Sequence, residues 1–291
     1  MIQRDVIVGI VGGRGKMGAW FRSFLEGQGC KVLISGRDTA LNPREMARRC
    51  DVVIISVPIR ATVDIIRQVG PHVRQDALFT DLTSLKIQPV KAMLTQSRAE
   101  VIGMHPLFGP GAQSLEGQNV ILCPARGDNW LPWLQGMLVR NGARAFISTP
   151  EKHDRMMSVI QGLRYFCSLS LGGAMMTMGA RMPECEKFST PIYRIFMDVV
   201  GRLLYQDPTL TAEICLHNPE TMAAVRVFRD WVDRWVRLFE QSDTDKFAAH
   251  LNEIRNYFGE FCKEASGETE FIIQALLQQQ SQNSVDLELK N

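Results

Sequence analysis

The sequence predicts an α/β domain with a doubly wound, mainly parallel sheet, followed by an all-helical domain. Short β-branched runs alternate with helical segments up to Pro150, and no β-rich run follows Glu151. Between Glu220 and Phe258 there is neither Gly nor Pro, a pattern typical of long helices. We therefore expect an α/β domain at 1–150, a helical domain at 151–280 and a polar, frayed tail at 281–291.

The expected strands are apolar runs of four to six residues that are rich in Val, Ile and Leu. Helical segments lie between most of them, which favours parallel pairing in one sheet. In chain order the runs are Val6–Val11, Lys31–Ser35, Val52–Val57, Ala77–Asp81, Val101–Met104, Val120–Cys123 and Ala143–Ser148.

The composition excludes several classes of partner. The apolar fraction of 45% and the charged fraction of 22% are ordinary for a globular protein, and a net charge of +2 gives no reason to expect a nucleic-acid partner. The seven cysteines include no C-x-x-C pair, which indicates reduced thiols and a cytoplasmic protein. No apolar run is long enough for a signal peptide or a membrane span, and no group of Asp, Glu and His has metal-ligand spacing.

A glycine-rich turn follows the first expected strand. The segment "VIVGIVGGRGKMGAWFRSFLEGQG" (6–29) contains G-x-G-x-x-G at Gly13, Gly15 and Gly18, between a strand and an amphipathic helix. This is the context of the Rossmann dinucleotide-binding fingerprint, in which the helix N-terminus attracts the pyrophosphate. The alternative is a tight turn without a ligand. We predict cofactor contacts from the turn residues Gly13, Arg14, Gly15, Lys16, Met17 and Gly18.

The end of the second expected strand bears on the choice between NAD and NADP. NAD-binding domains usually place an acid here for the ribose 2′-hydroxyl, whereas this chain has Ser35 and, two residues on, Arg37. A hydroxyl and a guanidinium suit a 2′-phosphate, which favours NADP. If Asp38 is the ribose acid, NAD is the cofactor. Further contacts are expected after the third strand, from Ser56, Val57 and Pro58.

Two later loops carry groups that could perform chemistry. "FTDLTSLK" (79–86) supplies Asp81, Ser84 and Lys86, and "VIGMHPLFGP" (101–110) places His105 on the loop after the fifth strand. Because ligands bind at the carboxyl ends of parallel strands, His105 could act as a base beside a nicotinamide. Taken alone, a histidine before proline is more often a structural residue.

These motifs together resemble the prephenate dehydrogenase family, above all the dehydrogenase part of bacterial bifunctional chorismate mutase–prephenate dehydrogenases. The resemblance covers about 95% of the chain, and it rests on the combination of motifs rather than on one of them. They are the glycine turn, "SVP", "DLTSLK", "HPLFGP", "EKHDRMMSVIQGLRYF", "STPIYRIFMDVVGRLLYQDP" and a patch at "FGEFCKEA".

The resemblance implies an enzyme with a Rossmann domain and a helical dimerisation domain. The implied reaction is the NAD(P)-dependent oxidative decarboxylation of a cyclohexadiene dicarboxylate, without a metal, in a homodimer joined through the helical domains. It makes His105 the catalytic base, places Ser84 near the same substrate hydroxyl, and assigns Lys86 to substrate binding. Trp231, Trp235, Leu238 and Phe239 form an apolar stripe that such a dimer could bury.

Further residues match positions near the family's substrate site. Arg202 and Arg194 match arginines on a helix near the site, although Arg194, Asp198 and Arg202 are also spaced to form ion pairs within one helix. Tyr165 stands where close relatives have a histidine lining the substrate pocket. His153 matches a histidine of structural character.

Several functions stay open at this stage. The expected substrate is prephenate, converted to 4-hydroxyphenylpyruvate in aromatic amino acid biosynthesis. 4-Amino-4-deoxyprephenate and arogenate are the alternatives within this family, because Tyr165 and Gly111 depart from its common pattern. A β-hydroxyacid dehydrogenase is disfavoured because the helical half lacks a G-x-x-x-K-like stretch. A protein that senses NAD(P) without catalysis would keep the glycine turn but would not need His105, Ser84 and Arg202 together.

Overall fold

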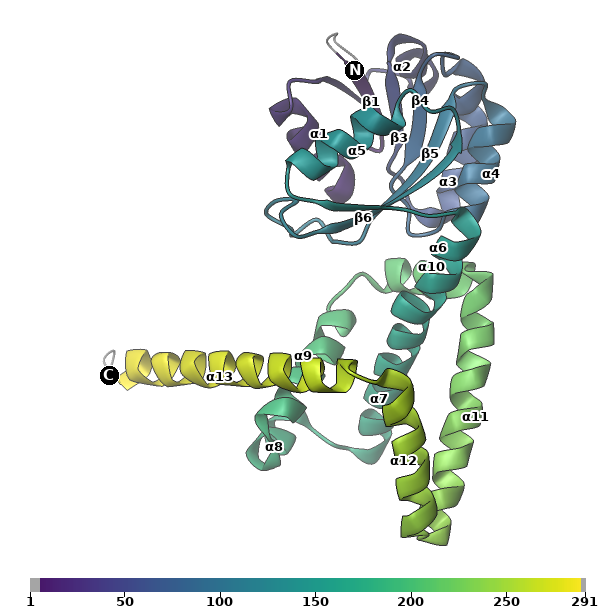
Figure 1. Ribbon diagram of the computed structural model, residues 1–291. Coiled ribbons are helices and arrows are strands. Elements are labelled where there is room, and N and C mark those ends of the chain that lie inside the picture. The colour runs from purple at the N-terminus through teal and green to yellow at the C-terminus, as the bar shows by residue number, and fades with distance from the viewer. Residues whose placement is uncertain (1–5, 289–291) are drawn as a thin grey trace. The chain divides into compact units, whose positions relative to one another are not determined.

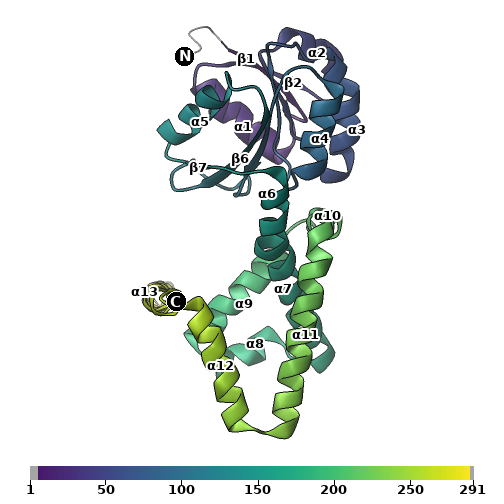
Figure 2. The same ribbon diagram turned by 45° about the vertical axis from the view of Figure 1, so that its right-hand side comes forward.

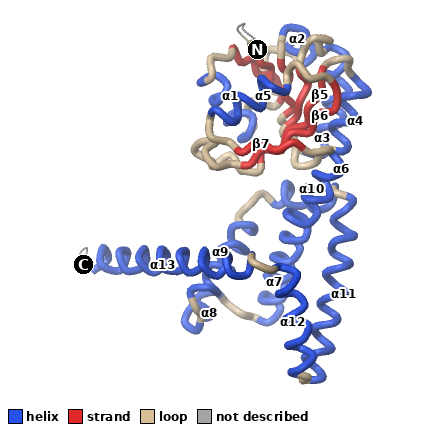
Figure 3. The backbone as a smooth tube through the Cα atoms, viewed as in Figure 1, coloured by secondary structure: helices blue, strands red, loops and turns tan. Residues whose placement is uncertain are grey.

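The computed structural model describes residues 6–288, which form two compact units (Figure 1). The sheet unit comprises 6–162 and 209–221, and the helical unit comprises 163–208 and 222–288. Strands occur in the first unit and only helices and turns in the second (Figure 3), which confirms the predicted fold class. The units divide later than residue 150, because α6 (Pro150–Met157) packs against α4 (Ile87–Gln96) and β6 (Asn119–Arg126) of the sheet unit.

One seven-stranded sheet organises the sheet unit, in the order β2-β1-β3-β4-β5-β6-β7. β1 to β5 pair in parallel, β6 is antiparallel to β5, and β7 is parallel to β6, so the sheet is mainly parallel as predicted. The strands are β1 (Ile7–Val11), β2 (Lys31–Ser35), β3 (Val52–Ile55), β4 (Leu78–Asp81), β5 (Glu100–Pro106), β6 (Asn119–Arg126) and β7 (Arg144–Ile147).

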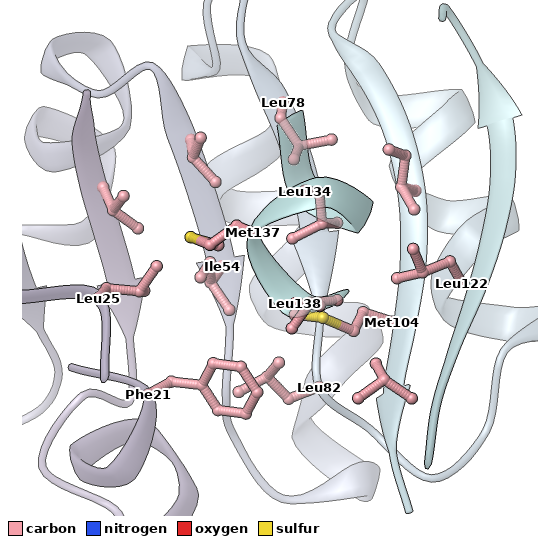
Figure 4. Close-up of a cluster of buried hydrophobic side chains, with 14 of the residues drawn as sticks. Phe21, Leu25, Ile54, Leu78, Leu82, Met104, Leu122, Leu134, Met137 and Leu138 are labelled. Atoms are coloured by element: carbon pink, nitrogen blue, oxygen red, sulfur yellow. The ribbon is translucent and has the colours of Figure 1, made fainter. Parts of the chain in front are cut away.

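Helices cover both faces of this sheet. α1 (Lys16–Gly27) and α5 (Leu131–Arg140) supply Phe21, Leu25 and Leu138 to an apolar cluster on one face (Figure 4). α2 (Pro43–Arg49), α3 (Ile59–Val69) and α4 (Ile87–Gln96) cover the other face. Each fully buried Leu or Phe side chain contributes about 1.5–3 kcal/mol, so the two clusters hold the carboxyl ends of the strands in fixed positions.

The strand order reverses between β1 and β3. At such a switch point the connections leave in opposite directions, and a crevice opens outside the carboxyl ends of the strands. The glycine turn after β1 and the Ser56–Pro58 segment after β3 both lie at this point. The topology therefore places both predicted cofactor segments at the same edge of the sheet.

The helical unit is built from α7 (Arg164–Met178), which follows a π-helical turn at Ser158–Leu163, and from the helices after it. α9 packs against α7 and against α13, and α13 also contacts α12. The helices are α8 (Met182–Cys185), α9 (Pro191–Leu204), α11 (Pro219–Gln241), α12 (Thr244–Phe258) and α13 (Phe261–Glu288); α10 (Pro208–His217) belongs to the sheet unit, and 3₁₀ turns lie at Gly70–His72 and Glu186–Phe188.

α11 and α12 form a hairpin (Figure 2) that accounts for part of the predicted apolar stripe. The Trp235 and Phe247 rings lie 5.1 Å apart, and those of Phe239 and Phe247 lie 5.9 Å apart. Leu238 is buried, yet Phe239 is 66% exposed, so α12 covers only one side of the stripe.

The prediction of a frayed tail at 281–291 was wrong for residues 281–288, which continue α13 as helix. Residues 289–291 lie outside the described residues. Within residues 6–288, no helix has both the length and the apolar character that a membrane crossing requires.

Candidate active site

The glycine turn is shaped by close approaches of the backbone. Gly12 has a φ of 84°, and a Cβ there would lie 2.1 Å from the Ser56 carbonyl oxygen. A Cβ on Gly18 would lie 2.4 Å from the Gly12 carbonyl oxygen. Glycine at these two positions therefore lets the turn fit between β3 and the start of α1.

The N-terminus of α1 is suited to an anion. Gly15 occupies the N-cap position, no side chain accepts a hydrogen bond there, and the first turn contains no acidic residue. The first backbone N–H groups of a helix point outward and carry partial positive charge. Arg14, Gly15 and Lys16 are exposed, Met17 is half-buried, and Gly13 and Gly18 are buried in the turn. These residues fit a pyrophosphate.

The end of β2 carries Ser35, one of the predicted cofactor contacts. Ser35 is 1% exposed, and its hydroxyl donates to the Leu41 carbonyl oxygen at 2.6 Å. The Ser35 side chain is therefore directed into the fold, and its predicted contact with the cofactor stays a prediction. Arg37 and Asp38 are both exposed, and Arg14 Nη1 donates to the Asp38 carbonyl oxygen at 2.6 Å.

After β3, Ser56 and Val57 are half-buried and Pro58 is exposed. Pro58 is the N-cap of α3, with an extended backbone at ψ 146°. The segment therefore lies at the switch-point edge of the sheet, as predicted.

His105 lies within β5 rather than on the loop that we predicted. Its register partner is Ile121 of the antiparallel strand β6, and the pairing continues to Pro106 and Val120. The sequence shows no β-branched run here, but the neighbouring strand extends β5 by two residues beyond the predicted end. His105 is 3% exposed, and its main chain pairs with β6.

A second histidine contacts the first. His105 Nδ1 lies 2.8 Å from His153 Nε2, and the two rings meet edge to face with centroids 5.0 Å apart. His153 Nδ1 in turn lies 2.7 Å from Asp154 Oδ1. Both His153 and Asp154 belong to α6 and are 2% exposed. A buried chain of three side chains therefore ends at His105.

The Asp154 carboxylate also binds the start of α4. Its Oδ1 accepts from the Lys86 backbone N–H at 2.8 Å, and its Oδ2 accepts from the Ile87 backbone N–H at 3.0 Å. The Asp154 carbonyl oxygen accepts from Asn218 Nδ2 at 2.7 Å. His153 was predicted to be structural and Asp154 was not predicted; the adjacent pair in "EKHD" was the available signal.

Burial lowers the pKa of His105 well below its usual value of 6.5, and the nearby positive charge of the Lys86 ammonium lowers it further. The ring is therefore neutral at pH 7. A neutral imidazole can accept a proton, which a general base must do.

Lys86, predicted to bind substrate, lies in the interior of the sheet unit, and that contact stays a prediction. The ammonium group is 0% exposed, forms an ion pair with Asp81 and donates to the Met104 carbonyl oxygen at 2.9 Å. Thr83 also donates to Asp81 from both its hydroxyl and its backbone N–H. These bonds fix the loop between β4 and α4, on which Ser84 is half-buried.

The remaining predicted residues lie in the helical unit. Arg194 pairs with Glu186 and, through Nε, with Asp198 at 2.9 Å, which matches the alternative of ion pairs within the helix. Arg202 is exposed on α9. Tyr165 is 5% exposed, and the Arg164 guanidinium lies 4.5 Å above the centre of its ring.

Comparisons with known proteins agree with this arrangement. The family model described as the nucleotide-binding domain of prephenate dehydrogenase matches residues 29–147, and the model described as its dimerization domain matches residues 149–253. The boundary between the two matched models lies close to residue 150, the predicted end of the α/β domain.

Among curated relatives, a probable arogenate/prephenate dehydrogenase of Methanocaldococcus jannaschii is 33% identical over 90% of this chain. The match spans only 63% of that relative's length. The T-protein of Haemophilus influenzae is 31% identical over 91% of this chain and 70% of its own.

Solved structures show the same fold. The Synechocystis arogenate dehydrogenase has a TM-score of 0.69 at 18% identity, covering 87% of this chain and 100% of its own. The Aquifex aeolicus prephenate dehydrogenase, solved with hydroxyphenyl propionate and NAD+, has a TM-score of 0.69 at 22% identity, covering 88% and 98%. The family models cover more than half of the sequence in the expected order, and so the chain belongs to the prephenate dehydrogenase family.

Proposed function

We propose that this chain catalyses the NAD(P)-dependent oxidative decarboxylation of prephenate to 4-hydroxyphenylpyruvate, a step of aromatic amino acid biosynthesis. The observation that carries the proposal is the state of His105. It is buried and neutral at pH 7, and one ring nitrogen is engaged by His153. The other ring nitrogen is the group that can take a proton from substrate.

The chain's part in the chemistry follows from this base. His105 Nε2 accepts the proton of the ring C4 hydroxyl, and Ser84 donates a hydrogen bond near the same oxygen. The C1 carboxylate leaves as CO2, its bonding electrons enter the ring, and the ring becomes aromatic. His105 then returns its proton to the phenolate oxygen, so the base is regenerated. A bound nicotinamide dinucleotide supplies the two-electron acceptor for the hydrogen on C4.

The turn residues from Gly13 to Gly18 and the segment Ser56–Pro58 would hold that dinucleotide. The open N-terminus of α1 and the close approach of Gly12 to Ser56 support this assignment. Arg202 would pair with a substrate carboxylate, and Tyr165 would line the pocket for the substrate side chain. We do not extend the carboxylate role to Arg194, because two acidic side chains already pair with it.

We favour NADP over NAD because two exposed arginines lie near the end of β2. Arg14 reaches the main chain at Asp38, and Arg37 precedes Asp38 directly. A 2′-phosphate placed there could pair with both guanidinium groups. The Asp38 carboxylate is the competing feature, since it could accept the ribose 2′-hydroxyl of NAD.

The substrate within the family is the finer question. The relative from Methanocaldococcus jannaschii carries arogenate and prephenate in its name, and a Streptomyces pristinaespiralis relative of 22% identity is a 4-amino-4-deoxyprephenate dehydrogenase. Tyr165, in place of the histidine usual in close relatives, keeps both alternatives to prephenate open.

The test is a kinetic matrix of three cyclohexadienes against NAD and NADP, followed by the absorbance of the reduced nucleotide. We expect the highest kcat/KM with prephenate and NADP. His105→Asn should lower kcat by about 10²–10⁴-fold, the usual contribution of a general base, while nucleotide binding stays unchanged. Arg37→Gln should weaken NADP more than NAD. The absence of turnover with every substrate would overturn the proposed activity.

The helical unit supports a homodimer as the assembly. The model matching residues 149–253 is described as a dimerization domain. α9 and its C-cap residue Tyr205 expose apolar side chains that their own unit does not cover, among them Phe196 at 57% and Tyr205 at 95%. We propose that a second copy of the chain covers this surface.

A further inference from the structure

We propose that His153 and Asp154 are positioning residues that set the tautomer of His105, so that its Nε2 carries the lone pair and its Nδ1 carries the proton. The proposal deepens the proposed function, because it rests on His105 acting as the base. It follows from the direction in which each hydrogen bond of the buried chain can run.

The direction is fixed at the Asp154 end. Asp154 Oδ1 and Oδ2 already accept the backbone N–H groups of Lys86 and Ile87, at 2.8 and 3.0 Å. These two donors and the positive N-terminal end of α4 are directed at the negative charge of the carboxylate. An ionised carboxylate can only accept hydrogen bonds. The 2.7 Å contact with His153 must therefore be a bond donated by His153 Nδ1–H.

The next link follows from the chemistry of imidazole. A neutral histidine carries one proton on its ring, so a proton on Nδ1 leaves Nε2 as an acceptor. His153 Nε2 lies 2.8 Å from His105 Nδ1, and one of these two nitrogens must donate. Because His153 Nε2 has only a lone pair, His105 Nδ1 supplies the proton. The lone pair of His105 is then on Nε2, where a general base needs it.

The same chain stabilises the protonated state during turnover. When Nε2 accepts a proton, the His105 ring becomes positive in a buried site near the ammonium of Lys86. The Nδ1–H bond to His153 then strengthens, and through His153 the positive ring is linked to the Asp154 carboxylate. Lys86 itself is neutralised by Asp81, so Asp154 is the carboxylate joined to His105 by this chain.

Asp154→Asn tests the direction of the chain. The Asn side chain has one oxygen for two backbone N–H groups, and when that oxygen accepts from Ile87 N–H the amide NH₂ faces His153. The NH₂ then donates to His153 Nδ1, so His153 would carry its proton on Nε2 and donate to His105 Nδ1. His105 would then hold its own proton on Nε2, the wrong atom for a base. We expect kcat to fall at least 100-fold with KM changed less than threefold. The ¹⁵N shifts of His105, assigned by comparison with His105→Asn, should change from the Nδ1–H to the Nε2–H tautomer.

Asn218→Ala is the matched control. Asn218 donates to the Asp154 main-chain oxygen at 2.7 Å, so its loss removes a buried bond to the same residue but leaves the carboxylate contacts intact. We expect a lower melting temperature, the Nδ1–H tautomer and a kcat within about threefold of the parent protein.

Two variants of His153 provide a second test that survives poor folding of Asp154→Asn. The side-chain oxygen of His153→Gln can accept from His105 Nδ1–H, whereas His153→Leu offers no acceptor. We expect the Gln variant to retain at least tenfold more kcat than the Leu variant. Equal kcat values, or an unchanged His105 tautomer in Asp154→Asn, would overturn the proposal. The NMR result needs no substrate: if His105→Asn proves fully active while the tautomer still switches, the proposed function fails and the positioning stands.

Discussion

Gly103 allows a lysine side chain to lie across the middle of the sheet. A Cβ at this position would lie 3.0 Å from Lys86 Cδ and 2.6 Å from Val90 Cγ2. The lysine can reach Asp81 and the Met104 carbonyl oxygen because β5 carries no side chain at this point. The sequence placed Lys86 in the correct loop, but its burial depends on this long-range fit and could not be predicted from the loop motif.

Gly103→Ala should therefore displace Lys86 and Val90 and lower the free energy of unfolding by about 1–3 kcal/mol, the usual cost of overpacking. Urea denaturation measures this loss. Gly111→Ala is the control, because a Cβ on Gly111 has no neighbour within 4 Å. Equal stability of the two variants would show that the β5 contact is not restrictive.

His105 should make the folded protein sensitive to mild acid. Its pKa in the folded state is well below 6.5, so below pH 6.5 the unfolded chain binds a proton that the folded protein does not. The free energy of unfolding should then decrease as the pH is lowered, by up to about 1.4 kcal/mol per pH unit from this group. Urea denaturation at pH 7.5 to 5.5 should show a shallower fall for His105→Asn, and parallel curves would contradict the lowered pKa.

At the scale of secondary structure, α1 depends on contact between its first turn and the glycine turn. A Cβ on Gly18 would meet the Gly12 carbonyl oxygen at 2.4 Å, whereas a Cβ on Gly27 of the same helix has no neighbour within 4 Å. One helix thus contains two glycines with different roles. Gly18 sets the approach of the helix to the glycine turn, whereas Gly27 is open to substitution.

Gly18→Ala should weaken nucleotide binding at least tenfold, because α1 must move away from the turn that its N-terminus serves. Gly27→Ala should leave binding unchanged and stabilise the protein by about 0.5–1 kcal/mol through its helix propensity. Isothermal titration with NADP and thermal denaturation separate the two effects. Unchanged affinity in Gly18→Ala would argue against the close fit.

The secondary structure was largely predictable, and the exceptions have physical causes. The strand runs were visible because buried parallel strands are continuously apolar, as Val52–Ile55 illustrates. The end of β5 was missed because His105 and Pro106 join the strand only through pairing with β6. The partnership of His105 with His153 spans 48 residues of sequence. It requires α6 to dock on the sheet unit, which no local pattern reveals.

At the scale of the whole molecule, apolar exposure is concentrated in the helical unit. Phe188 and Tyr257 are each 87% exposed, and Phe271 is 76% exposed. Exposed side chains of this size, spread over α9, α12 and α13 and the turn before α9, are more than a stable single chain usually leaves in water. The sequence predicted the apolar stripe on α11, but α12 partly covers it, and the more exposed groups lie elsewhere.

The chain should therefore behave as a dimer in solution. Light scattering at micromolar concentration should give about twice the chain mass of 32.8 kDa. The melting temperature should also rise with protein concentration, because association stabilises the folded chain. A mass of one chain, with a melting temperature independent of concentration, would contradict a dimer.

The hydrogen bonds of Asp154 imply an order in which the parts of the site form during synthesis of the chain. A chain released after Ile147 would contain every strand of the sheet, the glycine turn and His105. It would lack both His153, which contacts His105, and Asp154, whose carboxylate binds the start of α4. As the ribosome extends the polypeptide, the glycine turn and His105 can therefore be in place first, and the contact of His153 with His105 forms only when α6 has emerged.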